Sequence, residues 1–113
     1  MAMMFVNWEY GATTTAQKQK LSEKMIKAIM STSSAKGGMV AYQDMVCYPP
    51  APGPIISVRW TEGNSDEVKD AAVKALTDAV CEVTGHPAKG VKVIFDEIRP
   101  GDLSDGGTII NRR

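Results

Sequence analysis

One short pattern occurs twice in this chain, and that repetition constrains the fold more than any other feature. The repeated positions are Val6, Trp8 and Gly11 with Val58, Trp60 and Gly63, at a spacing of 52, and residues 35–37 (Ala-Lys-Gly) with 88–90, at a spacing of 53. Matches in the same order at a nearly constant spacing indicate a duplicated structural unit. The change of spacing from 52 to 53 predicts that the second unit has one additional residue, in its helix or in the turn after the helix.

Each copy has the pattern of a strand, a helix and a second strand. In the second copy, residues 55–60 are rich in β-branched and aromatic side chains, which favour a strand. Gly63 permits a turn, and Asn64 followed by Glu67 is a capping-box pattern typical of a helix start. Thr14 and Gln17 offer the same pattern in the first copy. We predict strands at 3–10, 39–48, 54–62 and 91–98, and helices at 15–32 and about 65–84.

The chain is long enough for one domain, residues 1–113. We divide it into a first βαβ unit (1–48), a proline-rich linker (49–53) and a second βαβ unit (54–113) that ends in a glycine-rich tail. Because a βαβ unit joins parallel strands by a right-handed crossover, two units predict an α+β fold. Its four-stranded sheet would carry both helices on one face. The other face has apolar strands, so we expect other subunits to cover it.

Composition excludes several classes of function. Thirteen basic and 13 acidic residues give no net charge, and no dense basic tract suggests nucleic-acid binding. No segment approaches the apolar length of a membrane span, and no signal peptide is evident, so we expect a cytoplasmic protein. A single histidine and scattered carboxylates argue against a metal site, and we expect no cofactor.

The second unit resembles the tautomerase superfamily, and within it the 4-oxalocrotonate tautomerase group. The matching residues are Pro54-Ile-Ile at the strand start, Glu62 to Glu67 at the helix start, Pro87, Val91-Lys-Val-Ile and Gly106-Gly107. The resemblance is closest over residues 54–107, and the first unit matches more loosely. The whole chain is similar to a fused member, in which two short units form one polypeptide. This resemblance implies a tautomerase/MIF-like fold and a homotrimer of fused chains.

Activity in this family depends on an amino-terminal proline whose secondary amine acts as a base in an apolar pocket. The repeat places Ala2 where the first unit would have that proline. Pro54 has the right identity in the second unit, but it is internal, and an amide nitrogen cannot act as a base. The chain therefore departs from the family pattern at its central residue.

The supporting positions of the family site are altered as well. An arginine after the strand-one glycine corresponds here to Ala12 and Asn64. A second arginine corresponds to Met39 and Lys92, and Lys92 keeps the charge without the two-pronged geometry that suits a carboxylate. The aromatic wall corresponds to Leu103, which is apolar but smaller.

These departures leave two hypotheses. In the first, removal of Met1 exposes the amine of Ala2, which acts as a weak or atypical base toward small 2-hydroxy-2-enoic (enol) acids or forms a Schiff base with a carbonyl. Lys92, Arg59 or a neighbouring subunit's Arg112 would then hold the carboxylate of the ligand. In the second, the protein is a non-catalytic binding or structural subunit that keeps the fold without the site.

Three other residues receive structural interpretations. Trp8 and Trp60 occupy equivalent strand positions and are predicted to anchor the core or a subunit interface. His86 follows the second predicted helix, where it can complement the negative end of the helix dipole.

Overall fold

The computed structural model describes residues 1–110 and has the predicted α+β architecture. Its elements are β1 (Ala2–Glu9), α1 (Thr15–Thr32), β2 (Gly38–Met45), β3 (Ile55–Thr61), α2 (Asp66–Thr84), β4 (Lys92–Ile98), β5 (Leu103–Asp105) and β6 (Thr108–Ile110). Both strand–helix–strand units are present, so the duplicated pattern predicted the fold correctly. The second strand ends at Met45, three residues before the predicted end, because the chain leaves the sheet well ahead of the proline-rich linker.

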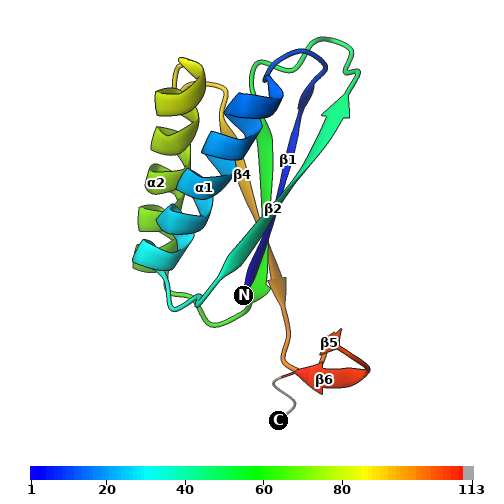
Figure 1. Ribbon diagram of the computed structural model, residues 1–113. Helices are drawn as coiled ribbons and strands as arrows, with labels where there is room; N and C mark the ends of the chain where they lie inside the picture. The colour runs from blue at the N-terminus through cyan, green and yellow to red at the C-terminus, as the bar shows by residue number, and fades with distance from the viewer. Residues whose placement is uncertain (111–113) are drawn as a thin grey trace.

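The main sheet has the strand order β2-β1-β3-β4, and both helices cover one of its faces (Figure 1). Strands within each unit are parallel, as a βαβ crossover requires, whereas β1 and β3 meet antiparallel. Phe5 pairs with Ser57, and these two residues are also each other's counterparts in the repeat. The two units are therefore related by an approximate twofold axis that passes between these residues.

The core lies between the sheet and the helices. Alternate residues of β1 and β3 point into it, and each helix contributes one apolar stripe. The buried apolar residues are Ala2, Met4, Val6, Trp8, Leu21, Met25, Ala28, Ile29, Ile56, Val58, Trp60, Ala72, Leu76, Ala79 and Val80. Both tryptophans are thus core residues, as predicted.

The helix starts confirm one capping box and correct the other. Thr14 Oγ1 accepts from the backbone N–H of Gln17 at 3.1 Å, and the Gln17 side chain accepts from the Thr14 N–H at 2.9 Å. In the second unit the N-cap is Ser65, whose hydroxyl accepts from the Val68 N–H at 3.2 Å. The predicted cap Asn64 instead donates to the Thr61 carbonyl at 3.2 Å.

The shifted cap changes how the two helices correspond. Leu21 and Met25 in α1 match Ala72 and Leu76 in α2 at a spacing of 51, not 52. The turn between β3 and α2 is therefore one residue shorter than the turn between β1 and α1. The connection from α2 to β4 is two residues longer than the connection from α1 to β2. Together these two differences give the one additional residue that the change of spacing predicted for the second unit.

An ion pair occurs at equivalent places in the two units. Lys18 of α1 pairs with Asp44 at the end of β2, at 3.0 Å, and Lys69 of α2 pairs with Glu97 near the end of β4. Each ammonium also lies 5.9 Å from an aromatic ring centroid, that of Tyr42 or Phe95. The hydrogen bond to Glu97 raises the pKa of Lys69. Each unit thus fastens its helix to its second strand in the same way.

The predicted glycine-rich tail is partly ordered as a β-hairpin. Strands β5 and β6 pair antiparallel, and Gly106 and Gly107 take positive φ angles of 59° and 84° in the turn between them. Such angles favour glycine because a Cβ atom would clash with the backbone. The hairpin projects from the body of the domain beyond the end of β4 (Figure 1).

The sheet face opposite the helices has no element of the chain packed over it in Figure 1. Its β1–β2 half carries uncharged side chains such as Phe5 and Met39, apart from Glu9 at the strand end. Its β3–β4 half carries Lys92 and the ion pair between Arg59 and Asp96. Across residues 1–110, no helix is both long and apolar enough to cross a membrane.

Candidate functional site

The start of β1 lies between two cavities. One has a volume of about 210 Å³ and is called here the serine cavity; it is lined by Met1, Ser33, Ser34, Ala35, Trp60, Thr61 and Asn64. The other has a volume of about 440 Å³ and is called the hairpin cavity; it is lined by Met1, Met3, Thr61, Leu103, Ser104, Asp105 and Ile110. Because Met1 and Thr61 line both, the two cavities adjoin at the first residues of the strand.

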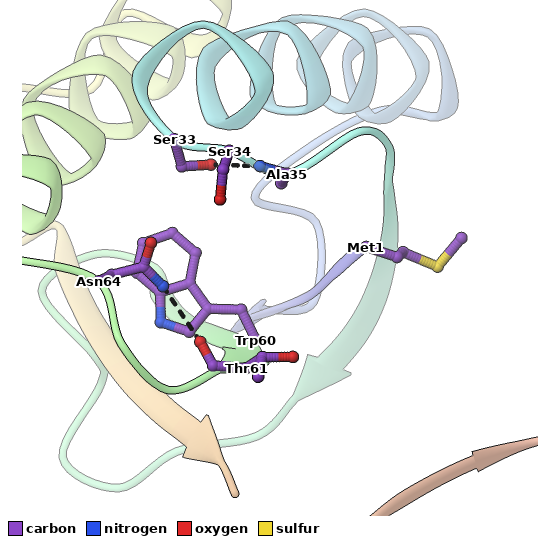
Figure 2. Close-up of a pocket in the computed structure, with 7 residues that line it drawn as sticks. All are labelled: Met1, Ser33, Ser34, Ala35, Trp60, Thr61 and Asn64. Carbon is purple, nitrogen blue, oxygen red and sulfur yellow. Dashed lines mark hydrogen bonds between the residues drawn. The ribbon is translucent and has the colours of Figure 1, made fainter. Parts of the chain in front are cut away.

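The serine cavity lies between the end of α1 and the end of β3 (Figure 2). Ser33 donates to the Ile29 carbonyl at 2.6 Å and accepts from the Ala35 N–H at 3.2 Å, which holds the polypeptide in a tight turn. Trp60 forms a wall and stacks on Phe95, with ring centroids 4.9 Å apart. Its indole nitrogen is buried and has no hydrogen-bond partner in residues 1–110.

Ala2 lies at the strand start, where the repeat predicted it. Its side chain is fully buried in the core, and its backbone nitrogen donates to the Gly37 carbonyl at 3.2 Å. Met1 is 75% exposed and borders both cavities. If Met1 were removed, the amine of Ala2 would therefore stand at the junction of the two cavities, held by Gly37.

Of the other predicted residues, Leu103 lies nearest to this point. It belongs to β5 and lines the hairpin cavity together with Met1. The projecting hairpin thus places an apolar side chain in a cavity that Met1 also lines. Arg112 lies outside the described residues.

Arg59 lies in a third cavity, of about 470 Å³, on the open face of the sheet. This arginine cavity is lined by Met3, Arg59, Asp96, Glu97, Ile98, Arg99 and Asp102. Arg59 pairs with Asp96 at 3.4 Å and lies 5.0 Å from the ring centroid of Phe5. The sequence did not single out Arg99, which pairs with Asp102 at 3.0 Å. Met3 lines both this cavity and the hairpin cavity, so the two are neighbours.

Lys92 is not brought to the same place. It pairs with Ile55 at the beginning of β3, whereas Arg59 is four residues further along and pairs with Met3. At 3.3–3.4 Å per residue this separates the Lys92 and Arg59 rows by about 13 Å. Lys92 could therefore reach a ligand beside Ala2 only from a neighbouring copy.

The charges around the start of β1 are few. No lysine or arginine is among the described residues that line the serine or hairpin cavities. The arginine cavity has two arginines, and each is already paired with an aspartate of the same chain. Residues 1–110 also contain no group of three histidine, cysteine, aspartate or glutamate side chains able to hold a metal ion.

His86 has a different environment from the one predicted. Its ring meets Trp8 edge-on, with centroids 5.4 Å apart. Its Nδ1 lies 2.6 Å from the Pro87 carbonyl oxygen and its Nε2 lies 2.8 Å from that of Pro52. The ring thus links Trp8 to the linker, and α2 ends before the C-cap residue Gly85, which takes a left-handed conformation with φ of 74°.

Comparison with known proteins identifies the family of this fold. A family model described as tautomerase enzyme matches residues 54–113. The chain therefore belongs to the tautomerase family. It is 32% identical over 56 residues to a probable tautomerase of Ralstonia nicotianae, a match that covers 50% of this chain and 86% of that one. A probable tautomerase of Listeria innocua is 33% identical over 54 residues, covering 48% and 88%.

Solved structures show the same fold over nearly the whole chain. The F6 fused 4-OT, described as a wild-type asymmetric trimer, has a TM-score of 0.85 at 18% identity and covers 95% of this chain and 94% of its own. A native fused 4-OT has a TM-score of 0.81 at 22% identity, with coverages of 95% and 94%. The likeness extends to both βαβ units, although the family model matches only the second.

Proposed function

We propose that this protein is a tautomerase-family isomerase of small 2-hydroxy-2-enoic acids whose base is the primary amine of Ala2. The observation that carries the proposal is that Ala2, whose nitrogen donates to the Gly37 carbonyl, directly follows Met1, which lines both cavities. On this proposal the Ala2 amine takes the place that the family resemblance gives to the base.

The proposed reaction moves one proton within the ligand. The neutral amine takes the proton of the enol hydroxyl and becomes an ammonium. As the carbonyl forms, the electron pair of the C=C bond takes this same proton from the ammonium to make the new C–H bond, and the amine is neutral again. The product is a 2-oxo acid with the same atoms, so no co-reactant is needed. A site with little access to water favours the uncharged amine, which is the form that accepts a proton.

Binding would use the groups that surround the amine. Leu103 gives the ligand an apolar wall, and Thr61 and Ser104 bring hydroxyl groups to the same cavity. The carboxylate needs a cation, and within residues 1–110 the predicted cation closest along the sheet to Ala2 is Arg59, in the adjoining cavity. To bind a ligand it must exchange Asp96 for the substrate, which costs little because this ion pair is exposed.

We propose a homotrimer as the working assembly. The open sheet face carries exposed apolar residues, including Met39 (41% exposed) and Ile94 (52%), which water would not favour. The uncharged β1–β2 half of this face and the charged β3–β4 half suit head-to-tail contact between copies. Similar fused proteins are described as trimers.

The alternative is a non-catalytic binding or structural subunit. It is favoured by one observation: no described cation lines either cavity beside Ala2, and Ala12 and Asn64 stand where the family has an arginine. Such a protein would keep the cavities and the assembly without turnover.

The test follows ketonisation of phenylenolpyruvate or 2-hydroxymuconate by ultraviolet absorbance, with the amino terminus defined by intact mass. The proposal predicts a rate above buffer that acetylation of the α-amine abolishes. An Ala2→Pro variant should be faster, on the order of 100-fold if general-base catalysis is restored. Leu103→Ala serves as a wall control and should raise KM more than it lowers kcat.

Two outcomes would count against the proposal. If the natural protein is inert and Ala2→Pro alone is active, the pocket works but the Ala2 amine is not a base, which supports the non-catalytic alternative. If both proteins are inert, the cavities are not a tautomerase site.

A further inference from the structure

The internal twofold relation predicts a second cavity that the structure does not leave open. The serine cavity belongs to the first unit's strand start, beside Met1, Ser33, Trp60 and Thr61. Applying the repeat to these positions gives, in order, Gly53, His86, Trp8 and Glu9. These four residues lie together at the start of β3, around the end of the proline-rich linker.

At this second place the linker fills the space. Glu9 Oε1 accepts from the Ala51 N–H at 2.6 Å, and His86 Nε2 lies 2.8 Å from the Pro52 carbonyl oxygen. The His86 ring also packs edge-on against Trp8. Both tryptophans are buried, with Trp8 9% exposed and Trp60 3%, so the difference between the halves lies in the linker and not in the burial of the indole. Glu9 and His86, which hold the linker, therefore stand where the serine cavity has its lining residues Thr61 and Ser33. The half of the molecule around the serine cavity is called here the open half, and the half around Trp8 the closed half.

The glycines of the two halves show the same contrast. Gly37 in the open half has no atom within 4 Å of the place where a Cβ would lie. At its counterpart Gly90, a Cβ would lie 2.9 Å from the Pro52 carbonyl oxygen. At Gly53 a Cβ would lie 2.6 Å from the Gly90 carbonyl oxygen and 2.9 Å from His86 Cε1. The linker is thus packed against the second unit at backbone contact distance.

We propose that residues 51–53 form a strap that closes a latent second binding cavity around Trp8. Glu9 and His86 hold this strap in place through the bonds to Ala51 and Pro52, which are called here the latch bonds. Each chain then presents one open site, beside Met1, and one closed site, beside Gly53. The inference rests on the proposed function only in taking the serine cavity as a working site.

The strap also explains why the two units can differ at their strand starts. The residue before the strand start borders two cavities in the first unit, where it is Met1, whereas in the second unit it is Gly53, which packs against Gly90. The strand-start residues themselves, Ala2 and Pro54, are both fully buried. The Pro54 carbonyl accepts from the Lys92 N–H at 3.0 Å, which fixes the strap's end to β4. A ligand could reach Trp8 only if the strap moved.

The test replaces Glu9 and His86 of the closed half by the threonine and serine that occupy the equivalent positions in the open half. In a Trp60→Phe background, Trp8 is the only tryptophan, because the chain has two. Quenching of its fluorescence by acrylamide should be weak, since the strap covers it. The double variant Glu9→Thr/His86→Ser removes both latch bonds, and the opening equilibrium should rise about tenfold to thirtyfold. Quenching should then increase clearly.

A second measurement avoids the Trp60 substitution. In the otherwise natural chain, His86→Ser removes the bond to Pro52 but leaves the Ala51–Glu9 bond in place. Hydrogen exchange at the Ala51 amide should nevertheless accelerate about fivefold, because the two bonds hold one strap. Ser33→Ala, at the equivalent place in the open half, is the matched control and should leave this rate unchanged.

Each measurement can overturn the proposal. Strong quenching of Trp8 in the parent would show that no strap protects it. Unchanged quenching in the double variant, with circular dichroism showing a folded protein, would show that Glu9 and His86 do not close the cavity. An unaltered Ala51 rate in His86→Ser would show that the two bonds do not act on one strap. None of these results depends on tautomerase activity, so a failure here is separate from a failure of the proposed function.

Discussion

The substitution Gly53→Ala tests the closed half most directly. The new Cβ would lie 2.6 Å from the Gly90 carbonyl oxygen, which is backbone and cannot rotate away. The strap must therefore move outward. We expect it to lose the Ala51–Glu9 bond and the His86–Pro52 contact, at about 1 kcal/mol each, and part of the packing of His86 on Trp8, at about 0.5–1 kcal/mol.

The expected total is about 2–3 kcal/mol. For a chain of 113 residues, an unfolding entropy of about 2.1 cal/mol/K per residue converts this into a fall in Tm of about 8–12 °C. The assay is thermal unfolding followed by circular dichroism, at one protein concentration because assembly contributes to the apparent stability.

The control is Gly37→Ala, a glycine-to-alanine change in the open half at the position equivalent to Gly90, the residue that Gly53 contacts. No atom lies within 4 Å of that Cβ, so no clash arises. Any gain from restricting the unfolded chain is common to both variants and cancels in their difference. If the two variants melt within about 2 °C of each other, the strap does not pack against Gly90 as described, and the closed site is refuted.

Two further predictions concern the core and the alkaline limit of stability. Leu76→Ala and its repeat counterpart Met25→Ala remove fully buried side chains, and each should cost about 2–5 kcal/mol in urea unfolding; a much smaller cost at one site would show that the halves are not packed alike. Burial raises the pKa of Tyr42 above its ordinary 10.0, so the native state holds the phenol proton more tightly than the unfolded chain does. This contribution is complete below pH 10 and is lost as the pH rises through the folded pKa. Urea unfolding from pH 8 to 11 should therefore show declining stability, less steep in Tyr42→Phe; equal slopes would contradict the assignment.

The fold could be predicted because its signals are local and occur twice. Trp8 with Gly11 and Trp60 with Gly63 mark equivalent strand ends, and each apolar helix stripe follows within a few residues. A wrong helix cap at Asn64 did not disturb this prediction, because the alternative cap is the next residue. Local errors of one residue leave the topology unchanged.

The site was harder to predict because it depends on contacts between distant segments. The repeat and the family resemblance singled out Ala2 and Leu103 as candidates, but nothing local indicated that Lys92 would lie at the other end of the sheet. The arginine cavity, with Arg99, arises only when β3, β4 and the loop before β5 meet. The role of His86 likewise depends on a linker more than 30 residues earlier in the chain.

Duplication explains how one chain can hold both an open and a closed version of one site. Two separate copies of a single short unit would carry the same residue at each position, so a side chain that closed one cavity would close both. In a fused chain the two positions mutate independently, and Ser33 can face open space while His86 fills the equivalent space. The linker between the two units supplies the strap, because polypeptide must precede the second unit at the position where the first unit has Met1. Because polypeptide precedes Pro54, its nitrogen is an amide and cannot act as a base, so the proposed Ala2 amine has no counterpart in the second unit.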